Sequence, residues 1–231
     1  MGDRYWVWLA ARLLAGIALV AWAFSYLTPG GSGEKEFQKA LDATKQVRTV
    51  RVAETADPSG TQHSDLSYEL VCSQSAYHFT WHMVESDPER PAQLNRDELR
   101  VGVLPYRRAS DGSWEKDTNL VSTANADTMC KLLARGENAN LLPDFKTMIQ
   151  RGIIQKGDKK TVNGVRCREW KVTLKGGVNL EHDTVCLGVD DHLPYEMTVD
   201  WTRSRSTYNY DSSFQLELPA AEVQQTNATS N

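Results

Sequence analysis

The segment 167-CREWKVTLKGGVNLEHDTVC-186 begins and ends with cysteine, and it decides how the second half of the chain folds. Gly176 and Gly177 in its middle suit a two-residue hairpin turn, because the central residues of such a turn take positive φ. A hairpin centred there places Cys167 opposite Cys186. Opposed residues of antiparallel strands have Cα atoms about 4.5–5.5 Å apart, a separation that a disulfide can bridge. The sequence therefore predicts two antiparallel strands joined by a Cys167–Cys186 disulfide.

Metal binding and redox catalysis explain these two cysteines less well. A tetrahedral metal site needs several ligands at short spacing, and no C-x-x-C motif lies near Cys167. Redox catalysis also relies on that close spacing. If Cys167 and Cys186 pair, elimination leaves Cys72 with Cys130, a bridge that would tie a mid-chain helix to the sheet. Four cysteines allow several connectivities, so the second bridge depends on the first.

The N-terminal segment, residues 1–28, contains a stretch without charge from Leu13 to Leu27. A membrane anchor needs about 20 apolar residues, and the stretch reaches that length if it extends across Arg12. A cleavable signal peptide fits as well, with an A-x-A site at residues 21–23. The choice between anchor and signal peptide stays open. Both place the following domain outside the cytoplasm, where cysteines become oxidised.

The rest of the chain divides by composition. Residues 29–33 form a Gly/Ser linker, and residues 34–219 have the length of one large domain. Residues 220–231 are small and polar, and we expect this tail to be disordered. The expected organisation is therefore one exported domain behind a membrane or signal segment.

The periodicity within the domain predicts an α+β fold. A helix is expected over residues 34–47, followed by about five strands up to residue 117. Two short helices are expected between residues 123 and 152, where Asn125 or Asp127 can cap the first. Four further strands follow. Strands that succeed one another through hairpins form an antiparallel sheet, with the helices gathered on one side.

The polar residues of the chain form no recognisable catalytic or metal-binding arrangement. His78 and His82 fall on one strand, with Cα atoms about 13 Å apart, too far to share a metal. Residues 190–192, Asp-Asp-His, lie where a turn is expected. The net charge is −4 without a basic stripe, which argues against a nucleic-acid partner. We therefore expect no enzyme activity, no cofactor, no metal and no nucleic-acid partner.

Aromatic side chains are spread over the predicted strands. Trp81, Tyr106, Trp114 and Trp201 each lie in a strand-like segment. Each ring taken alone is best explained as core. Taken together, the four allow a second interpretation, in which several line the concave face of a curved sheet and contact an apolar ligand.

Several segments resemble one family, the LolA-like and LppX/LprG-like lipoprotein carriers. The resemblance lies in 99-LRVGVLPYRRASDGSWEKD-117, in 162-VNGVRCREWKVTL-174, in 184-TVCLGVDDHLPYEMTV-199 and in 214-FQLELP-219, and it spans roughly residues 34–219. It implies a curved antiparallel sheet, an unclosed half-barrel, whose concave side is covered by helices above an apolar cavity. It also implies carriage of acyl chains or lipids through an aqueous compartment, or, as in related domains, periplasmic sensing.

The chain departs from this family at its N-terminus, because no cysteine is available there for lipidation. A fixed anchor suits local holding or handing over better than shuttling between membranes. The expected function is thus an exported, membrane-anchored protein that binds a lipid or acyl chain on the periplasmic side of the cytoplasmic membrane, or a protein secreted to the periplasm. The alternative is a periplasmic sensor or interaction domain with an envelope protein partner and no lipid ligand.

Overall fold

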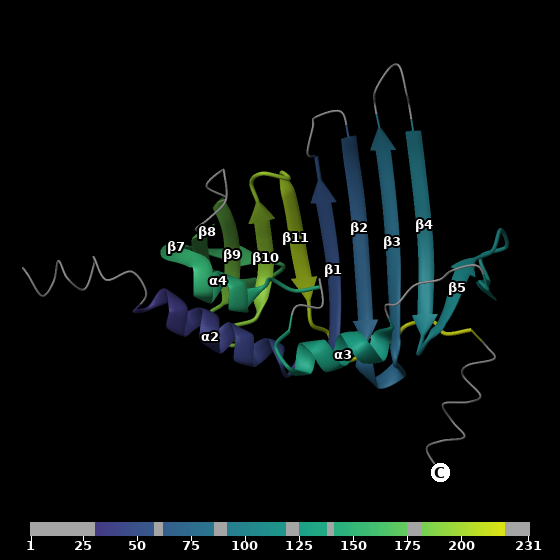
Figure 1. Ribbon diagram of the computed structural model, residues 1–231, viewed down its shortest axis with the longest axis horizontal. Coiled ribbons are helices and arrows are strands. Elements are labelled where there is room, and N and C mark those ends of the chain that lie inside the picture. The colour runs from purple at the N-terminus through teal and green to yellow at the C-terminus, as the bar shows by residue number, and fades with distance from the viewer. Residues whose placement is uncertain are drawn as a thin grey trace, which may run out of the picture.

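The computed structural model describes residues 31–57, 62–85, 92–118, 125–137, 141–174 and 182–219. Within them, eleven strands form one antiparallel sheet, with helices along one of its faces (Figure 1). The helices are α2 (Gly33–Thr44), α3 (Ala126–Ala134) and α4 (Phe145–Arg151), with a short 3-10 turn, η1 (Cys72–Gln74). The strands are β1 (Thr49–Ala56), β2 (Gln62–Val71), β3 (Ala76–Glu85), β4 (Ala92–Val101), β5 (Leu104–Arg108), β6 (Trp114–Lys116), β7 (Gly152–Val162), β8 (Val165–Leu174), β9 (His182–Gly188), β10 (Pro194–Val199) and β11 (Ser204–Asn209).

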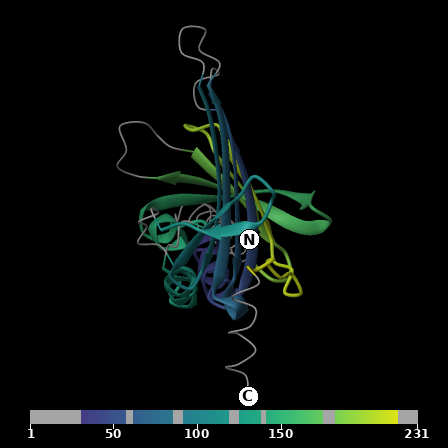
Figure 2. The ribbon, with the colours of Figure 1, turned by 90° about the vertical axis from the view of Figure 1, so that its right-hand side faces the viewer.

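The sheet is open, with β6 at one edge and β7 at the other. Its strand order is β6-β5-β4-β3-β2-β1-β11-β10-β9-β8-β7. The first and last strands of the chain, β1 and β11, therefore pair in the middle and join two hairpin-connected halves. Figure 2 shows that the sheet twists strongly, since the green strands run across the direction of the long blue ones. The predicted fold class, α+β with an unclosed antiparallel sheet, is confirmed.

The helices cover the sheet in two groups. The buried face of α2 presents Phe37, Ala40 and Leu41 to Trp170 of β8 and to the apolar side of α4. The other helix, α3, packs its Leu133 over β1, β2 and β3. The Asn125 side chain caps α3 by accepting from the Thr128 amide at 2.7 Å, as the sequence allowed. Gly136, with φ of +63°, lies just after its C-terminus.

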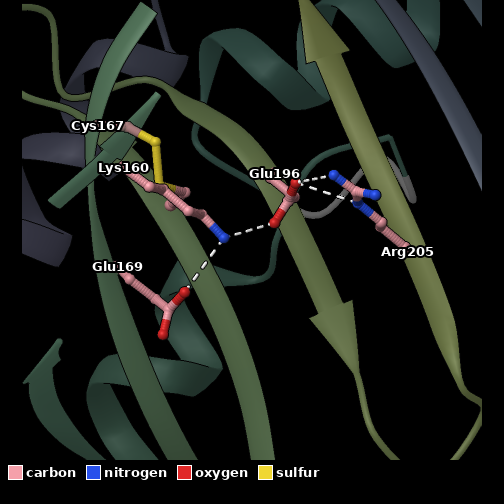
Figure 3. Close-up of a disulfide and its surroundings, with 6 residues drawn as sticks. Lys160, Cys167, Glu169, Glu196 and Arg205 are labelled. Carbon is pink, nitrogen blue, oxygen red and sulfur yellow. Dashed lines mark hydrogen bonds and ion pairs between the residues drawn. A yellow bond between two sulfur atoms is a disulfide. The ribbon is translucent and has the colours of Figure 1, made fainter. Parts of the chain in front are cut away.

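Both expected disulfides are present. Cys72–Cys130 links η1, directly after β2, to α3 and so ties this helix to the sheet. Cys167–Cys186 links β8 to β9, with Cα atoms 5.6 Å apart (Figure 3). The predicted register of this hairpin was wrong, however. Cys167 pairs with Gly188 and Cys186 pairs with Glu169, so the bridge runs diagonally between strands.

The observed register is offset by two residues from the predicted one. Thr173 is the partner of His182, and the turn predicted at Gly176-Gly177 falls outside the described residues. A shift of two residues leaves every side chain on its original face of the sheet, since side chains alternate with period two. Both sulfurs therefore still lie on one face, and the disulfide survives the change of register.

The final described segment, residues 210–219, covers the face of the sheet opposite the helices, here called the outer face. Gln74 holds it through two hydrogen bonds to the backbone of Leu216, at 3.0 and 2.8 Å. Leu216 packs with Leu99 and Tyr106 in a separate apolar cluster. The guanidinium of Arg51 lies 4.6 Å from the centre of the Phe214 ring. The sheet is thus covered on both faces, by helices on one and by this segment on part of the other.

No helix in the described ranges is long and apolar enough to cross a bilayer. The expected anchor or signal segment, residues 1–28, and the expected tail, residues 220–231, lie outside those ranges.

Candidate ligand-binding groove

The four aromatic residues proposed as a ligand lining do not converge. Trp81 lies on the helix-bearing face, in the same row as Leu66. Tyr106 and Trp114 lie on the outer face, in the cluster beneath residues 210–219. Trp201 lies in the turn between β10 and β11 and is 67% exposed. The expectation that several of these rings share the concave face is therefore corrected: only Trp81 is on the helix-bearing side.

The register of β5 explains why Tyr106 and Trp114 lie on the outer face. Tyr106 is the partner of Leu99, and Leu99 is the partner of His78, whose ring stacks edge-on against Trp114. This row faces away from the helices. The sequence alone did not reveal that the C-terminal segment crosses that face, so the aromatic rings there had no visible packing partner other than a ligand.

A different set of residues forms a groove between the sheet and the segment that leads into α4. Its volume is about 340 Å³, at the lower end of the range of ligand sites. The sheet supplies the floor and residues 141–148 supply the roof. The lining consists of Val52, Glu54, Tyr68, Leu141, Leu142, Pro143, Asp144, Thr147, Met148, Leu174, Asp183, Met197, Val199, Ser204, Ser206 and Tyr208.

The roof is fixed by local capping and by packing. The Asp144 carboxylate accepts from the Thr147 amide at 3.1 Å and from the Thr147 hydroxyl at 2.8 Å, which defines the start of α4. Leu141 and Phe145 are buried against the sheet and α2. Met148 also faces the groove. The roof is therefore a rigid apolar ledge.

The floor changes from apolar to polar along the strands. Val52, Tyr68 and Tyr208 lie in one row across β1, β2 and β11. Two rows further on, Ser204 and Asp183 flank Val199 at the ends of their strands. A groove with one apolar and one polar end can hold an elongated amphipathic molecule in one orientation.

Carboxylates dominate the polar end. Asp183 is only 6% exposed, and Ser206 donates to Glu54 at 3.1 Å. Burial raises the pKa of Tyr208 far above its ordinary value, and the Glu54 carboxylate raises it further. The pKa of Tyr68 is raised by the same two causes in the same order. Both phenols therefore stay neutral over the physiological range and place no charge in the apolar row of the floor.

The histidine and aspartate residues considered in the sequence analysis make contacts that stabilise strands and turns. His78 lies between two carboxylates, 3.0 Å from Glu69 and 2.8 Å from Asp97. Asp191 shapes the turn after β9 by accepting from the Leu193 amide and the Tyr195 hydroxyl. In the described part of the chain, no group of three or more His, Cys, Asp or Glu side chains is placed to hold a metal.

Comparison with known proteins identifies the fold. No family model matches the sequence, and no curated protein matches it either. The crystal structure of LprF from Mycobacterium bovis superposes with a TM-score of 0.54 at 13% identity, covering 83% of this chain and 99% of LprF. The fold of this chain is thus similar to that of LprF, which agrees at the level of the fold with the resemblance found in the sequence.

Two other structures match more distantly, with TM-scores too low to carry an argument. MucB, in complex with the periplasmic part of MucA, gives 0.41 at 12% identity, and the chain spans 60% of MucB and 82% of itself. A putative outer membrane lipoprotein-sorting protein domain from Vibrio parahaemolyticus gives 0.27 at 10% identity, with 86% of this chain and 98% of that domain covered.

Proposed function

We propose that this protein holds a single acyl chain, as part of a lipid or lipid-like molecule, in the groove between the sheet and residues 141–148. The observation that supports it is the amphipathic groove on the helix-bearing face of a LolA-like fold. Removing a hydrocarbon chain from water is favourable by about 0.8 kcal/mol per CH₂ group. The groove therefore needs no charged contact to bind such a chain.

The groove also indicates the orientation and the head group of the ligand. The tail lies along Val52, Tyr68 and Tyr208, and the head lies beside Glu54 and Asp183 at the ends of the strands. Two carboxylates in a partly buried place repel an anionic head. The preferred head group is therefore uncharged or cationic, such as a hydroxyl or an amine.

The proposed location is the cell envelope, on the periplasmic side of the cytoplasmic membrane. The two disulfides fit an oxidising compartment, and the apolar stretch Leu13–Leu27 would keep the domain at the membrane as an anchor. We propose a binding role without catalysis: Asp191 shapes a turn, and His78 holds three strands together.

A blocking substitution tests the groove. Val199 faces the groove from the end of β10, while its neighbour Thr198 points to the outer face. Val199→Trp should weaken binding of a fluorescent fatty alcohol by at least about tenfold, because the indole fills space that the chain needs. Thr198→Trp, the matched control, should bind the probe like the unmodified protein. Equal affinity for all three proteins would refute the groove as the binding site.

Binding to a protein partner is the second candidate. Beyond the part of the sheet that α3 covers, the helix-bearing face of β2–β4 carries Leu66, Trp81, Met83 and Leu94, the last of which is 41% exposed. Such an apolar surface suits a partner chain. If the purified protein neither retains lipid in native mass spectrometry nor binds the fatty alcohol, this second function replaces the first.

A further inference from the structure

A second groove, separate from the proposed acyl-chain groove, lies beside the first half of α2. Its volume is about 580 Å³, and its walls come from α2, β7, β8 and β9. Trp170 and Leu187 form a buried apolar floor. Four basic side chains surround this floor: Lys35, Lys39, Lys156 and Arg168. The combination of an apolar floor and a basic rim differs from the acidic polar end of the first groove.

The positive charge of this groove is only partly neutralised. Its one carboxylate, Glu36, is shared between Lys39 at 2.7 Å and His192 at 3.2 Å. Lys35 and Lys156 are exposed and form no ion pair among the described residues. The chain as a whole carries a net charge of −4, so the charge of this basic rim is opposite in sign to the overall charge. A local excess of cations above an apolar floor attracts an anion that has an apolar part.

The position of the groove in the chain indicates where such an anion would come from. Gly31 and Ser32 line the groove, and the uncharged stretch of the N-terminal segment ends at Leu27. Four residues span at most about 14 Å when fully extended. If Leu13–Leu27 lies in the membrane, Gly31 lies within that distance of its end, which keeps the groove close to the phosphate groups of the bilayer surface.

We infer that this groove binds the phosphate of an anionic phospholipid from the membrane that carries the anchor. The phosphate contacts Lys35, Lys156 and Arg168, and the adjoining glycerol and first methylene groups rest on Trp170 and Leu187. This inference rests on the anchoring part of the proposed function and adds a lipid contact outside the acyl-chain groove. Binding here would fix the orientation of the domain on the membrane.

The test uses the full chain in uncharged maltoside micelles, titrated with dioleoyl-phosphatidylglycerol or with dioleoyl-phosphatidylcholine and followed by native mass spectrometry. Phosphatidylglycerol should bind more tightly than phosphatidylcholine, and only the binding of phosphatidylglycerol should depend on the basic rim. The double variant Lys35→Gln/Lys156→Gln should lose about tenfold in apparent affinity, because each basic group near an anionic surface contributes a several-fold factor. The matched control, Lys159→Gln/Lys171→Gln, removes the same charge from β7 and β8 outside the groove and should bind normally.

Three outcomes would overturn the inference: no preference for phosphatidylglycerol, an equal loss in the control, or saturation by soluble glycerol phosphate at the concentrations that the lipid needs. The last outcome would define a site for free phosphate compounds. An unchanged thermal transition of each variant establishes that the fold is intact. Binding of the fatty alcohol is measured on the same variants, so failure of this groove is distinguished from failure of the acyl-chain groove.

Discussion

Lys160 of β7 and Glu196 of β10 form an ion pair that reaches across β8 and β9, with Nζ 2.6 Å from Oε1 (Figure 3). Arg205 of β11 contacts the other oxygen of the same carboxylate at 2.6 Å, and Glu169 lies 3.1 Å from Lys160. Glu196 is 5% exposed. One buried carboxylate therefore connects the edge of the sheet with its centre, next to the Cys167–Cys186 disulfide.

Removal of this charge should destabilise the protein. Glu196→Gln keeps the shape but leaves Arg205 without this carboxylate and Lys160 with Glu169 alone, and we expect a loss of about 1–3 kcal/mol in the free energy of unfolding. Both cations are partly exposed, so hydration limits the loss. Urea denaturation measures it. Glu217→Gln, at a carboxylate that is 82% exposed and 3.8 Å from Arg108, should change stability by less than about 0.5 kcal/mol. Equal effects at the two positions would contradict this role of Glu196.

His78 should make stability depend on pH. Burial alone would lower its pKa, but hydrogen bonds to Glu69 and Asp97 outweigh burial and raise it above 6.5. Because the folded-state pKa is the higher one, the protonated ring stabilises the fold fully below pH 6.5. This contribution is lost as the pH rises through the folded-state pKa. Urea midpoints above pH 6.5 should therefore fall in the unmodified protein and stay flatter in His78→Gln. The exposed His63→Gln serves as control and should reproduce the unmodified profile.

The two disulfides should contribute unequally. Cys72–Cys130 spans 58 residues and Cys167–Cys186 spans 19. A cross-link restricts the unfolded chain more when the loop is longer, and we expect losses of about 4 and about 3 kcal/mol for the two pairwise alanine variants. Thermal or urea unfolding gives the comparison. Peptide mapping without reduction checks both pairings, and a free thiol at Cys167 in exported protein would contradict the Cys167–Cys186 bridge.

The loss of stability on substitution should distinguish a buried aromatic ring of the core from an exposed ring on the surface. Tyr106 is 5% exposed on the outer face, and Tyr106→Ala should cost about 3 kcal/mol, as expected for a large buried side chain. Trp201→Ala should change stability by less than about 0.5 kcal/mol. Neither variant should alter affinity for the fatty alcohol. A selective loss of probe binding in Trp201→Ala, with stability unchanged, would restore its role as a ligand contact.

The acidic end of the acyl-chain groove should select against acids. The unmodified protein should bind a fluorescent fatty alcohol more tightly than the fatty acid of the same length, since Glu54 repels a carboxylate head. Glu54→Gln should reduce this difference several-fold while leaving the affinity for the alcohol nearly unchanged. A competition titration with both probes provides the measurement. Equal affinities for acid and alcohol in the unmodified protein would remove the proposed orientation of the ligand.

Local sequence signals predicted much of the fold. The Asn125 cap and the pairing of four cysteines depend on neighbouring residues or on strand geometry, and the structure contains them. Strand β7 was not expected, because GIIQKGDKKTV does not alternate between apolar and polar residues. It is an edge strand, and edge strands tolerate lysine on either side.

The position of the candidate groove depends on contacts that local patterns do not encode. Leu141, Leu142 and Pro143 appear in the sequence as the approach to a helix, and only tertiary packing makes them the roof of a groove. In the same way, predicting that Tyr106 and Trp114 pack on the outer face would have required knowing that a segment about one hundred residues later in the chain covers that face. The one available signal was the apolar pair Leu141-Leu142 directly before Pro143, which is unusual for a surface loop.

The pairing of β1 with β11 sets the order in which the molecule can assemble. The hydrogen bond from Ser206 to Glu54 joins residues 152 apart in sequence, and the hydrogen bond from the Leu216 amide to Gln74 joins residues 142 apart. Contacts of such separation slow folding, because a long loop must close before they form. The N-terminal half cannot complete its sheet or cover its outer face until synthesis is almost finished. If the chain is exported, as proposed above, it stays open while it is made, which is the state that a translocation channel accepts, and its sheet is completed only after the last strand has emerged on the far side.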